Sequence, residues 1–227
     1  MKASMFPLGV LIVAATCGGV ATADDSTPML HPVEKVCITY ESSGQMMNGT
    51  TLRCHRDYGY EMFEIEDMTI GIGGFSQTQK AHRVTIGDQI YAVDPDTNTG
   101  TQTTNPIYEP IVNAVTQNGS DSVSDAFLSA MGYTSTGQTQ MVAGLACTIY
   151  NSQMIGTACL TEDGLALEQT VLGNVMTATS VVYEPGEDQN YRRHETAEIT
   201  QGPDLSNGLN GIDIGNGVNL GDLLNQQ

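Results

Sequence analysis

The feature that most constrains the fold of this chain is a succession of short strand-like runs separated by turn residues. Val36–Tyr40 is rich in β-branched and aromatic residues, which favour strands. Arg83–Ile86 and Gln89–Val93 are separated only by Gly87-Asp88. Glycine adopts the positive φ that tight hairpin turns require, so these two runs predict a β-hairpin.

The second half of the chain continues the pattern as a predicted antiparallel meander. Its last run alternates from Val175 to Tyr183, as expected for a strand with two different faces. An earlier run places Met62 and Glu64 on one face, and Phe63 and Ile65 on the other. The predicted strands are Ala146–Tyr150, Met154–Cys159, Leu165–Val171 and Val175–Tyr183, and the predicted turns are Asn48-Gly49, Asn151-Ser152 and Glu162-Asp163-Gly164.

The middle of the chain has helical rather than strand-like spacing. Pro106–Val115 is one candidate helix, and Val123–Met131 is a second, with apolar residues recurring every four positions. Ser122 is a suitable N-cap for the second helix, and Gly132 is suited to end it. We therefore expect two short helices before the second group of strands.

The N-terminus has the pattern of a secretory signal. Met1-Lys2 gives a positive start, Phe6–Val13 is almost entirely apolar, and Ala21-Thr22-Ala23 has the small residues that signal peptidase requires. We therefore expect cleavage after Ala23 and a periplasmic or secreted location. The alternative is a lipoprotein that carries its lipid on Cys17.

These boundaries divide the chain into three parts. Residues 1–23 are the expected signal peptide, and residues 24–201 form one antiparallel β domain. Residues 202–227 are rich in Gly and Asn, which predicts a flexible tail. After the signal, no run approaches the ~20 apolar residues of a membrane-spanning helix, so no transmembrane segment is expected in the mature chain.

The charge and the cysteines limit the partners and the chemistry. The net charge of −18 repels phosphate backbones, so nucleic acid is not an expected partner. Cys37, Cys54, Cys147 and Cys159 follow the signal and allow three disulfide pairings. We favour Cys37–Cys54 and Cys147–Cys159, because each pair spans a short strand–turn–strand. A four-thiolate zinc site normally has much closer pairs, and no cofactor is expected.

One loop has the beginning of a calcium-binding pattern. Asp94, Asp96 and Asn98 place oxygen donors at alternate positions. However, the sixth position, normally Gly, is Thr99, and the twelfth, normally Glu, is Asn105. A polar turn after the strand is the favoured interpretation, and calcium is the alternative.

The sequence lacks a recognisable catalytic motif. The four histidines, His31, His55, His82 and His194, are far apart in the sequence, and no Gly-x-Ser-x-Gly motif is present. Because all four cysteines after the signal are expected in disulfides, no thiol is left for nucleophilic catalysis. We therefore expect the protein not to be an enzyme.

Several motifs resemble a group of exported bacterial proteins. They are Ile90–Pro95, Val142–Tyr150 with the later Cys159, and Gly164–Leu167. Those proteins are similar to the LolA/LolB-type lipoprotein carriers, and the resemblance spans roughly Tyr60–Tyr183. It implies a mainly β (α+β) fold: a curled antiparallel sheet, or incomplete β-barrel, with two short helices covering its concave face.

The resemblance also leads to an expected function. We expect a non-enzymatic binding protein that holds an apolar or acyl ligand, such as a lipid, between sheet and helices. Candidate lining residues, chosen for their apolar character, are Phe63, Ile65, Phe127 and Met131. The alternative is a structural or protein-interaction module of the cell envelope, with another envelope protein as its partner.

Overall fold

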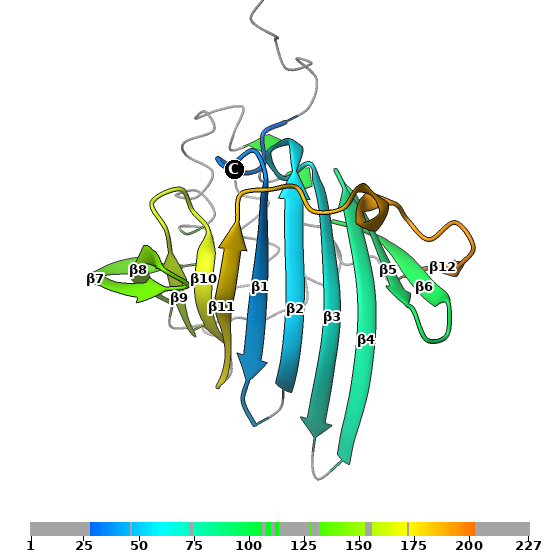
Figure 1. Ribbon diagram of the computed structural model, residues 1–227, viewed down its shortest axis with the longest axis horizontal. Helices are drawn as coiled ribbons and strands as arrows, with labels where there is room; N and C mark the ends of the chain where they lie inside the picture. The colour runs from blue at the N-terminus through cyan, green and yellow to red at the C-terminus, as the bar shows by residue number, and fades with distance from the viewer. Residues whose placement is uncertain are drawn as a thin grey trace, which may run out of the picture.

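The computed structural model shows one open β-sheet (Figure 1). The order of the strands is β12-β6-β5-β4-β3-β2-β1-β11-β10-β9-β8-β7. The structure describes residues 28–45, 47–72, 75–105, 108–109, 112–113, 128, 132–152, 156–171 and 173–202. The predicted signal peptide and all of the predicted tail except Gly202 lie outside these residues.

The described strands and short helices have the following bounds. The strands are β1 Val36–Ser43, β2 Met47–Arg56, β3 Glu61–Ile72, β4 Phe75–Ile86, β5 Gln89–Asp94, β6 Thr99–Thr104, β7 Thr134–Val142, β8 Leu145–Ser152, β9 Gly156–Leu160, β10 Ala166–Val171, β11 Asn174–Val182 and β12 Glu198–Gln201. The 3-10 helices are η1 Asp57–Gly59 and η3 Asp188–Tyr191.

The sheet consists of two groups of consecutive strands that meet at β1. The first strand pairs with β2 on one side and with β11 on the other, and both pairings are antiparallel. The short strand β12 pairs with β6 in parallel, whereas the sequence predicted a wholly antiparallel sheet. The chain returns from β11 across the sheet to the outer side of β6. There β12 adds to the edge of the sheet and runs in the same direction as β6.

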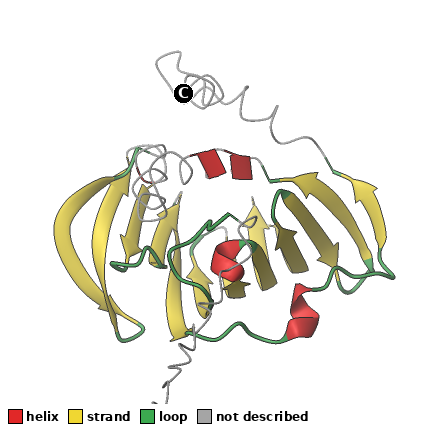
Figure 2. Ribbon diagram, turned by 90° about the horizontal axis from the view of Figure 1, so that it is seen from above, coloured by secondary structure: helices red, strands yellow, loops and turns green. Residues whose placement is uncertain are grey.

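The predicted fold class is confirmed at the level of a mainly β, open sheet. Figure 2 shows that the sheet is curved. The two predicted helices, Pro106–Val115 and Val123–Met131, fall largely outside the described residues. Within them Tyr108–Glu109, Val112–Asn113 and Leu128 are helical, and no helix of seven or more residues occurs in the described part of the chain.

Two turns predicted from glycine are confirmed. Gly87 has a φ of +57°, and the residues on either side of the turn, Ile86 and Gln89, pair as the ends of a hairpin. Gly164 has a φ of +78° and donates its N–H to the carbonyl oxygen of Thr161 at 3.0 Å. Both positions use the left-handed backbone region that favours glycine.

Two other predicted turns are wrong. Asn48 and Gly49 lie within β2, because the chain reverses earlier, at Gly44. The Asn48 side chain donates to the carbonyl oxygen of Gly44 at 3.1 Å, so it stabilises that turn from inside the strand. Asn151 and Ser152 are likewise strand residues, at the end of β8.

The two faces of the sheet have different coverings. Phe63 of β3 packs edge-on against Tyr191 of η3, with 4.8 Å between ring centres. We call the face that carries Phe63 the front face. Because side chains alternate along a strand, Glu64 lies on the opposite side, which we call the back face.

A connection that we call the strap, residues 183–197, covers part of the front face. Figure 1 shows it as the orange segment crossing in front of the central strands from β11 toward β12. Tyr191 of the strap packs on Cys54, Phe63 and Val84 of the sheet, and all four residues are almost completely buried. The strap therefore stabilises the front face through apolar packing.

Replacing Gly186 of the strap by alanine is expected to lower the free energy of unfolding by about 1–3 kcal/mol. Gly186 has a φ of +75°, and a Cβ there would lie 3.0 Å from Cys37 Sγ and 3.2 Å from Phe63 Cε1. The matched control is Gly144→Ala, because Gly144 has a φ of +80° and no atom within 4 Å of its Cβ position. Urea unfolding of both variants checks the prediction, and equal losses would contradict it.

Candidate functional site

A small hollow on the back face follows from the strand register. Met176 of β11 pairs with Ser42 of β1, Ser42 pairs with Gly49 of β2, and Gly49 pairs with Met68 of β3. Residues directly opposite one another in a sheet share a face. Two small residues therefore lie between two long methionines, which leaves a depression across the two central strands.

Gly49 is required for the close approach of β2 to β3 beside this depression. A Cβ at this position would lie 2.1 Å from the Asp67 carbonyl oxygen, 2.8 Å from the Met68 Cα and 2.9 Å from Met68 Sδ. Real Cβ atoms essentially never approach heavy atoms that closely. Only glycine therefore allows the Met68 thioether to take up its present position above the strand.

The hollow has a volume of about 130 Å³ and a mixed lining. This is close to the roughly 150 Å³ of a cavity known to hold benzene, and below the ~300 Å³ at which pockets for drug-sized molecules begin. The lining residues are Ser42, Met47, Thr51, Arg53, Glu66, Met68, Ile70, Gln79 and Met176. The hollow therefore combines apolar walls with several hydrogen-bonding groups.

Beside the hollow, one cross-strand row carries alternating charges. Arg53 of β2, Glu64 of β3 and Arg83 of β4 are directly opposite one another. Arg53 Nε donates to Glu64 Oε1 at 2.5 Å, and Arg83 also donates to Glu64. Arg83 Nη1 reaches Glu66 Oε1 at 3.0 Å, so two arginines and two glutamates form a network without net charge.

The surroundings fix the charge states of this network. Burial opposes ionisation of Glu64, but the two neighbouring guanidinium groups outweigh it and lower the pKa of the Glu64 carboxyl. The guanidinium of Arg53 lies 5.5 Å from the centre of the Tyr40 ring. Burial raises the pKa of the Tyr40 phenol, whose hydroxyl donates to the Ala166 carbonyl at 2.8 Å. The Tyr40 phenol is therefore neutral, and its ring packs beside the Arg53 guanidinium.

One hydroxyl in the lining of the hollow has no hydrogen-bond partner among the described residues. Ser42 is 6 % exposed, and its Oγ makes no hydrogen bond within the described structure. Buried hydroxyls are normally hydrogen-bonded, and an unsatisfied one costs about 1–3 kcal/mol. Ser42 therefore presents an unsatisfied hydroxyl to whatever occupies the hollow.

Two of the four residues predicted to line a ligand site, Phe63 and Ile65, lie on the front face, away from the hollow. Phe63 is 1 % exposed under Tyr191 on the front face, and Ile65, on the same face, is 38 % exposed. Phe127 and Met131 lie outside the described residues. Phe63 and Ile65 were chosen for their apolar character, whereas the lining of the hollow combines methionines and Ile70 with polar and charged residues.

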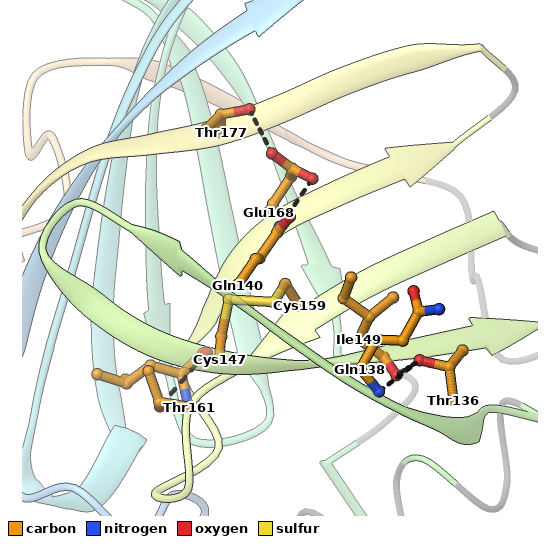
Figure 3. Close-up of a disulfide and its surroundings, with 10 residues drawn as sticks. Thr136, Gln138, Gln140, Cys147, Ile149, Cys159, Thr161, Glu168 and Thr177 are labelled. Carbon is orange, nitrogen blue, oxygen red and sulfur yellow. Dashed lines mark hydrogen bonds between the residues drawn. A yellow bond between two sulfur atoms is a disulfide. The ribbon is translucent and has the colours of Figure 1, made fainter.

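Both expected disulfides are present. Cys37–Cys54 joins directly opposed residues of β1 and β2. Cys147–Cys159 joins β8 to β9, and Figure 3 shows it beside the side chains of Gln140 and Glu168. The favoured pairing is therefore confirmed, and each bond ties together strands that are neighbours in the sheet.

The calcium alternative corresponds to the polar turn between β5 and β6. Asp94 Oδ1 accepts the backbone N–H of Asp96 at 2.8 Å. Asp96 pairs with Lys80 at 3.5 Å, and Asn98 donates to the Thr196 carbonyl at 2.9 Å. In the described part of the chain, no group of three or more His, Cys, Asp or Glu residues could hold a metal ion.

The histidines form two pairs rather than a catalytic arrangement. His82 Nδ1 contacts His194 Nε2 at 2.5 Å, which links β4 to the strap. The rings of His31 and His55 lie 4.6 Å apart, and His55 Nε2 donates to the Val33 carbonyl at 3.0 Å. These contacts fasten chain segments to the sheet.

Lowering the pH from about 6.5 to 4.5 is expected to destabilise the fold through these histidines. Burial and the neighbouring His55 ring lower the pKa of His31 to about 4, and burial also lowers the pKa of His55. The unfolded chain binds protons near pH 6.5, whereas the folded chain resists them until about pH 4. Stability is therefore full above about pH 6.5 and decreases as the pH falls, by up to about 3 kcal/mol for His31.

Urea unfolding at several pH values between 7.5 and 4.5 measures this effect. A His31→Asn variant is expected to show a shallower decrease, because asparagine does not titrate. An equal pH dependence of the variant and the parent chain would contradict the role of His31.

Comparisons with known proteins place the chain in no family. No known protein family matches it. No curated protein matches it either. An uncharacterised conserved protein from Thermus thermophilus has a similar structure, with a TM-score of 0.47 and 9 % sequence identity over 74 % of this chain and 90 % of that chain. At this level the similarity carries no information on function. No described helix is long and apolar enough to cross a membrane.

Proposed function

We propose that this chain is an exported, non-enzymatic binding protein that holds a small amphipathic molecule in the hollow of the back face. The observation that carries the proposal is the lining of that hollow. Met47, Met68, Met176 and Ile70 supply an apolar wall, and Arg53 lies among them as a charged group. A cavity with apolar walls and a few convergent polar groups is the usual form of a small-molecule site.

Methionine suits such a wall for a physical reason. Its side chain is unbranched and its thioether is polarisable, so it adapts to the shape of an apolar ligand. Three of the lining residues are methionines, and they come from β2, β3 and β11. An acyl or similar chain segment held among them would gain dispersion contacts on several sides.

Export is supported by the two disulfides and by the sequence of the first 23 residues. Disulfides form and persist in oxidising compartments. The resemblance to the LolA/LolB-type carriers agrees with a binding role for a curved, open sheet. We further propose that the two short helices predicted between Pro106 and Met131 cover the curved face and close the site.

The experiment uses a matched pair of serines at the end of β1. Ser42 lies at the floor of the hollow, whereas the next residue, Ser43, is exposed on the opposite face. Ser42→Leu is expected to fill the hollow, and Ser43→Leu is the control. The parent chain and both variants are exported to the periplasm of an expression host, purified and compared by native mass spectrometry.

The expected result is an added mass on the parent chain and on Ser43→Leu that is lost on denaturation and is absent from Ser42→Leu. The same adduct on all three proteins would contradict the proposed place of binding. A bare mass for all three would contradict small-molecule binding and favour the alternative, a structural or protein-interaction module of the envelope.

A further inference from the structure

We infer that the polar end of the bound molecule is a carboxylate, and that the ligand class is a short-chain acyl carboxylate. The inference rests on the proposed function, and it names the chemistry that the same hollow recognises. It depends on three observations: the unsatisfied Ser42 hydroxyl, the donors of Arg53, and the volume available.

The Ser42 hydroxyl requires a hydrogen-bonding partner, which a ligand oxygen can supply. Its Oγ is buried at the floor of the hollow and has no partner in the described structure, although Thr51 and Gln79 line the same hollow. A hydroxyl can donate one hydrogen bond. A purely apolar ligand would leave this group unsatisfied, whereas a ligand oxygen beside Ser42 would satisfy it.

Arg53 supplies the positive charge that a ligand carboxylate requires. A guanidinium has five N–H donors, and the bond to Glu64 uses Nε alone. The terminal nitrogens form the fork that matches a carboxylate. Since Glu64 is also held by Arg83, a carboxylate at Arg53 would add to the existing network rather than displace Glu64.

The balance of donors and acceptors in the lining favours a ligand carboxylate over a ligand ammonium group. Ser42, Thr51, Arg53 and Gln79 can all donate, and Glu66 is the carboxylate in the lining. Glu66 already accepts from Arg83 at 3.0 Å. A ligand ammonium group would face the Arg53 guanidinium and would share the Glu66 carboxylate with Arg83, whereas a ligand carboxylate would meet several donors.

The volume limits the length of the ligand. The volume of the hollow, about 130 Å³, is close to the ~150 Å³ of a cavity that holds benzene. Benzene has six heavy atoms. A carboxylate with a short chain, about six to eight heavy atoms in all, is therefore the largest molecule that the described hollow can enclose. Hexanoate is a suitable probe.

The test compares three probes with the same chain: hexanoate, 1-hexanol and hexylamine. Ligand-observed NMR titration of the full-length mature protein gives the three dissociation constants. Hexanoate is expected to bind at least ~10-fold more tightly than 1-hexanol, because charge-assisted hydrogen bonds are the stronger kind. Ser42→Ala is expected to weaken hexanoate binding several-fold and 1-hexanol binding to a smaller extent, because the hydrogen bond to a neutral hydroxyl is the weaker one. Ser43→Ala is the control.

Each outcome has a distinct meaning. Binding of 1-hexanol or hexylamine as tight as that of hexanoate would overturn the carboxylate inference and leave the proposed apolar binding function standing. Equal hexanoate binding by Ser42→Ala and Ser43→Ala would overturn the role of Ser42. Failure of all three probes to bind the parent chain would overturn the proposed function itself.

Discussion

Replacing Glu64 by glutamine is expected to lower the free energy of unfolding by about 2–4 kcal/mol. The Glu64 side chain is 12 % exposed and accepts from both Arg53 and Arg83, which are 32 % and 34 % exposed. Removing the shared carboxylate leaves the partly buried guanidinium of Arg53 without the carboxylate it pairs with, and leaves Arg83 with Glu66 alone. The partial exposure of the arginines keeps the expected loss below that of a fully buried network.

The matched control is Asp96→Asn, which makes the same chemical change in an exposed pair. Asp96 is 67 % exposed and lies 3.5 Å from Lys80. Exposed pairs contribute about 0–1 kcal/mol, so this variant is expected to unfold almost like the parent chain. Urea unfolding at neutral pH measures both variants. A loss for Glu64→Gln no greater than that for Asp96→Asn would show that the network is not structurally important.

Removing the Cys147–Cys159 disulfide by a double serine substitution is expected to cost about 3 kcal/mol. The bond joins residues 12 positions apart and ties β8 to β9. Figure 3 shows a chain of hydrogen bonds beside it, from Gln140 through Glu168 to Thr177, which crosses from β7 to β11. Loss of the disulfide would loosen β8 and β9, which lie between the strands that form this series of hydrogen bonds.

The control for this variant is the corresponding double serine variant at Cys37 and Cys54. That bond joins residues 17 positions apart, so closing its loop removes a similar entropy from the unfolded chain. Urea unfolding is measured for the two double variants and for the parent chain without and with reductant. The differences give the contribution of each disulfide to the free energy of unfolding. A loss below about 1 kcal/mol for Cys147–Cys159 would contradict its expected role.

Much of the strand arrangement could be predicted where apolar alternation and glycine turns coincide. The hairpin around Gly87 and the turn at Gly164 are confirmed, and both depend on a positive φ that glycine supplies. The disulfides were predictable because each pair spans one reversal of the chain. These features are local in sequence, so local physical rules are sufficient to predict them.

Polar strands were missed for an equally physical reason. Strands β6 and β7 consist mainly of Thr, Ser, Gln and Gly, and most residues of β7 are exposed. Such strands bury little apolar area and show no alternation of apolar and polar residues. Their place in the sheet is set by hydrogen bonding to a neighbouring strand, which a pattern of hydrophobicity does not report.

The candidate site could not be predicted from the sequence, because it depends on long-range register. Ser42 and Met176 become neighbours only through the pairing of β1 with β11, strands far apart in the chain. The alternation along β3 was visible, and it correctly separates Phe63 from Glu64. Which of these two faces holds a hollow was not visible, because the residues that line it come from strands far apart in the sequence.

Binding in the hollow can be observed directly in an NMR spectrum of the protein labelled with ¹³C at the methionine methyl groups, recorded with and without hexanoate. We expect the signals of Met47, Met68 and Met176 to shift on addition of hexanoate. Met141, which is 66 % exposed on the edge strand β7, is the internal control and is expected not to shift. Unchanged signals for the three methionines of the hollow, or equal shifts for Met141, would contradict binding at this site.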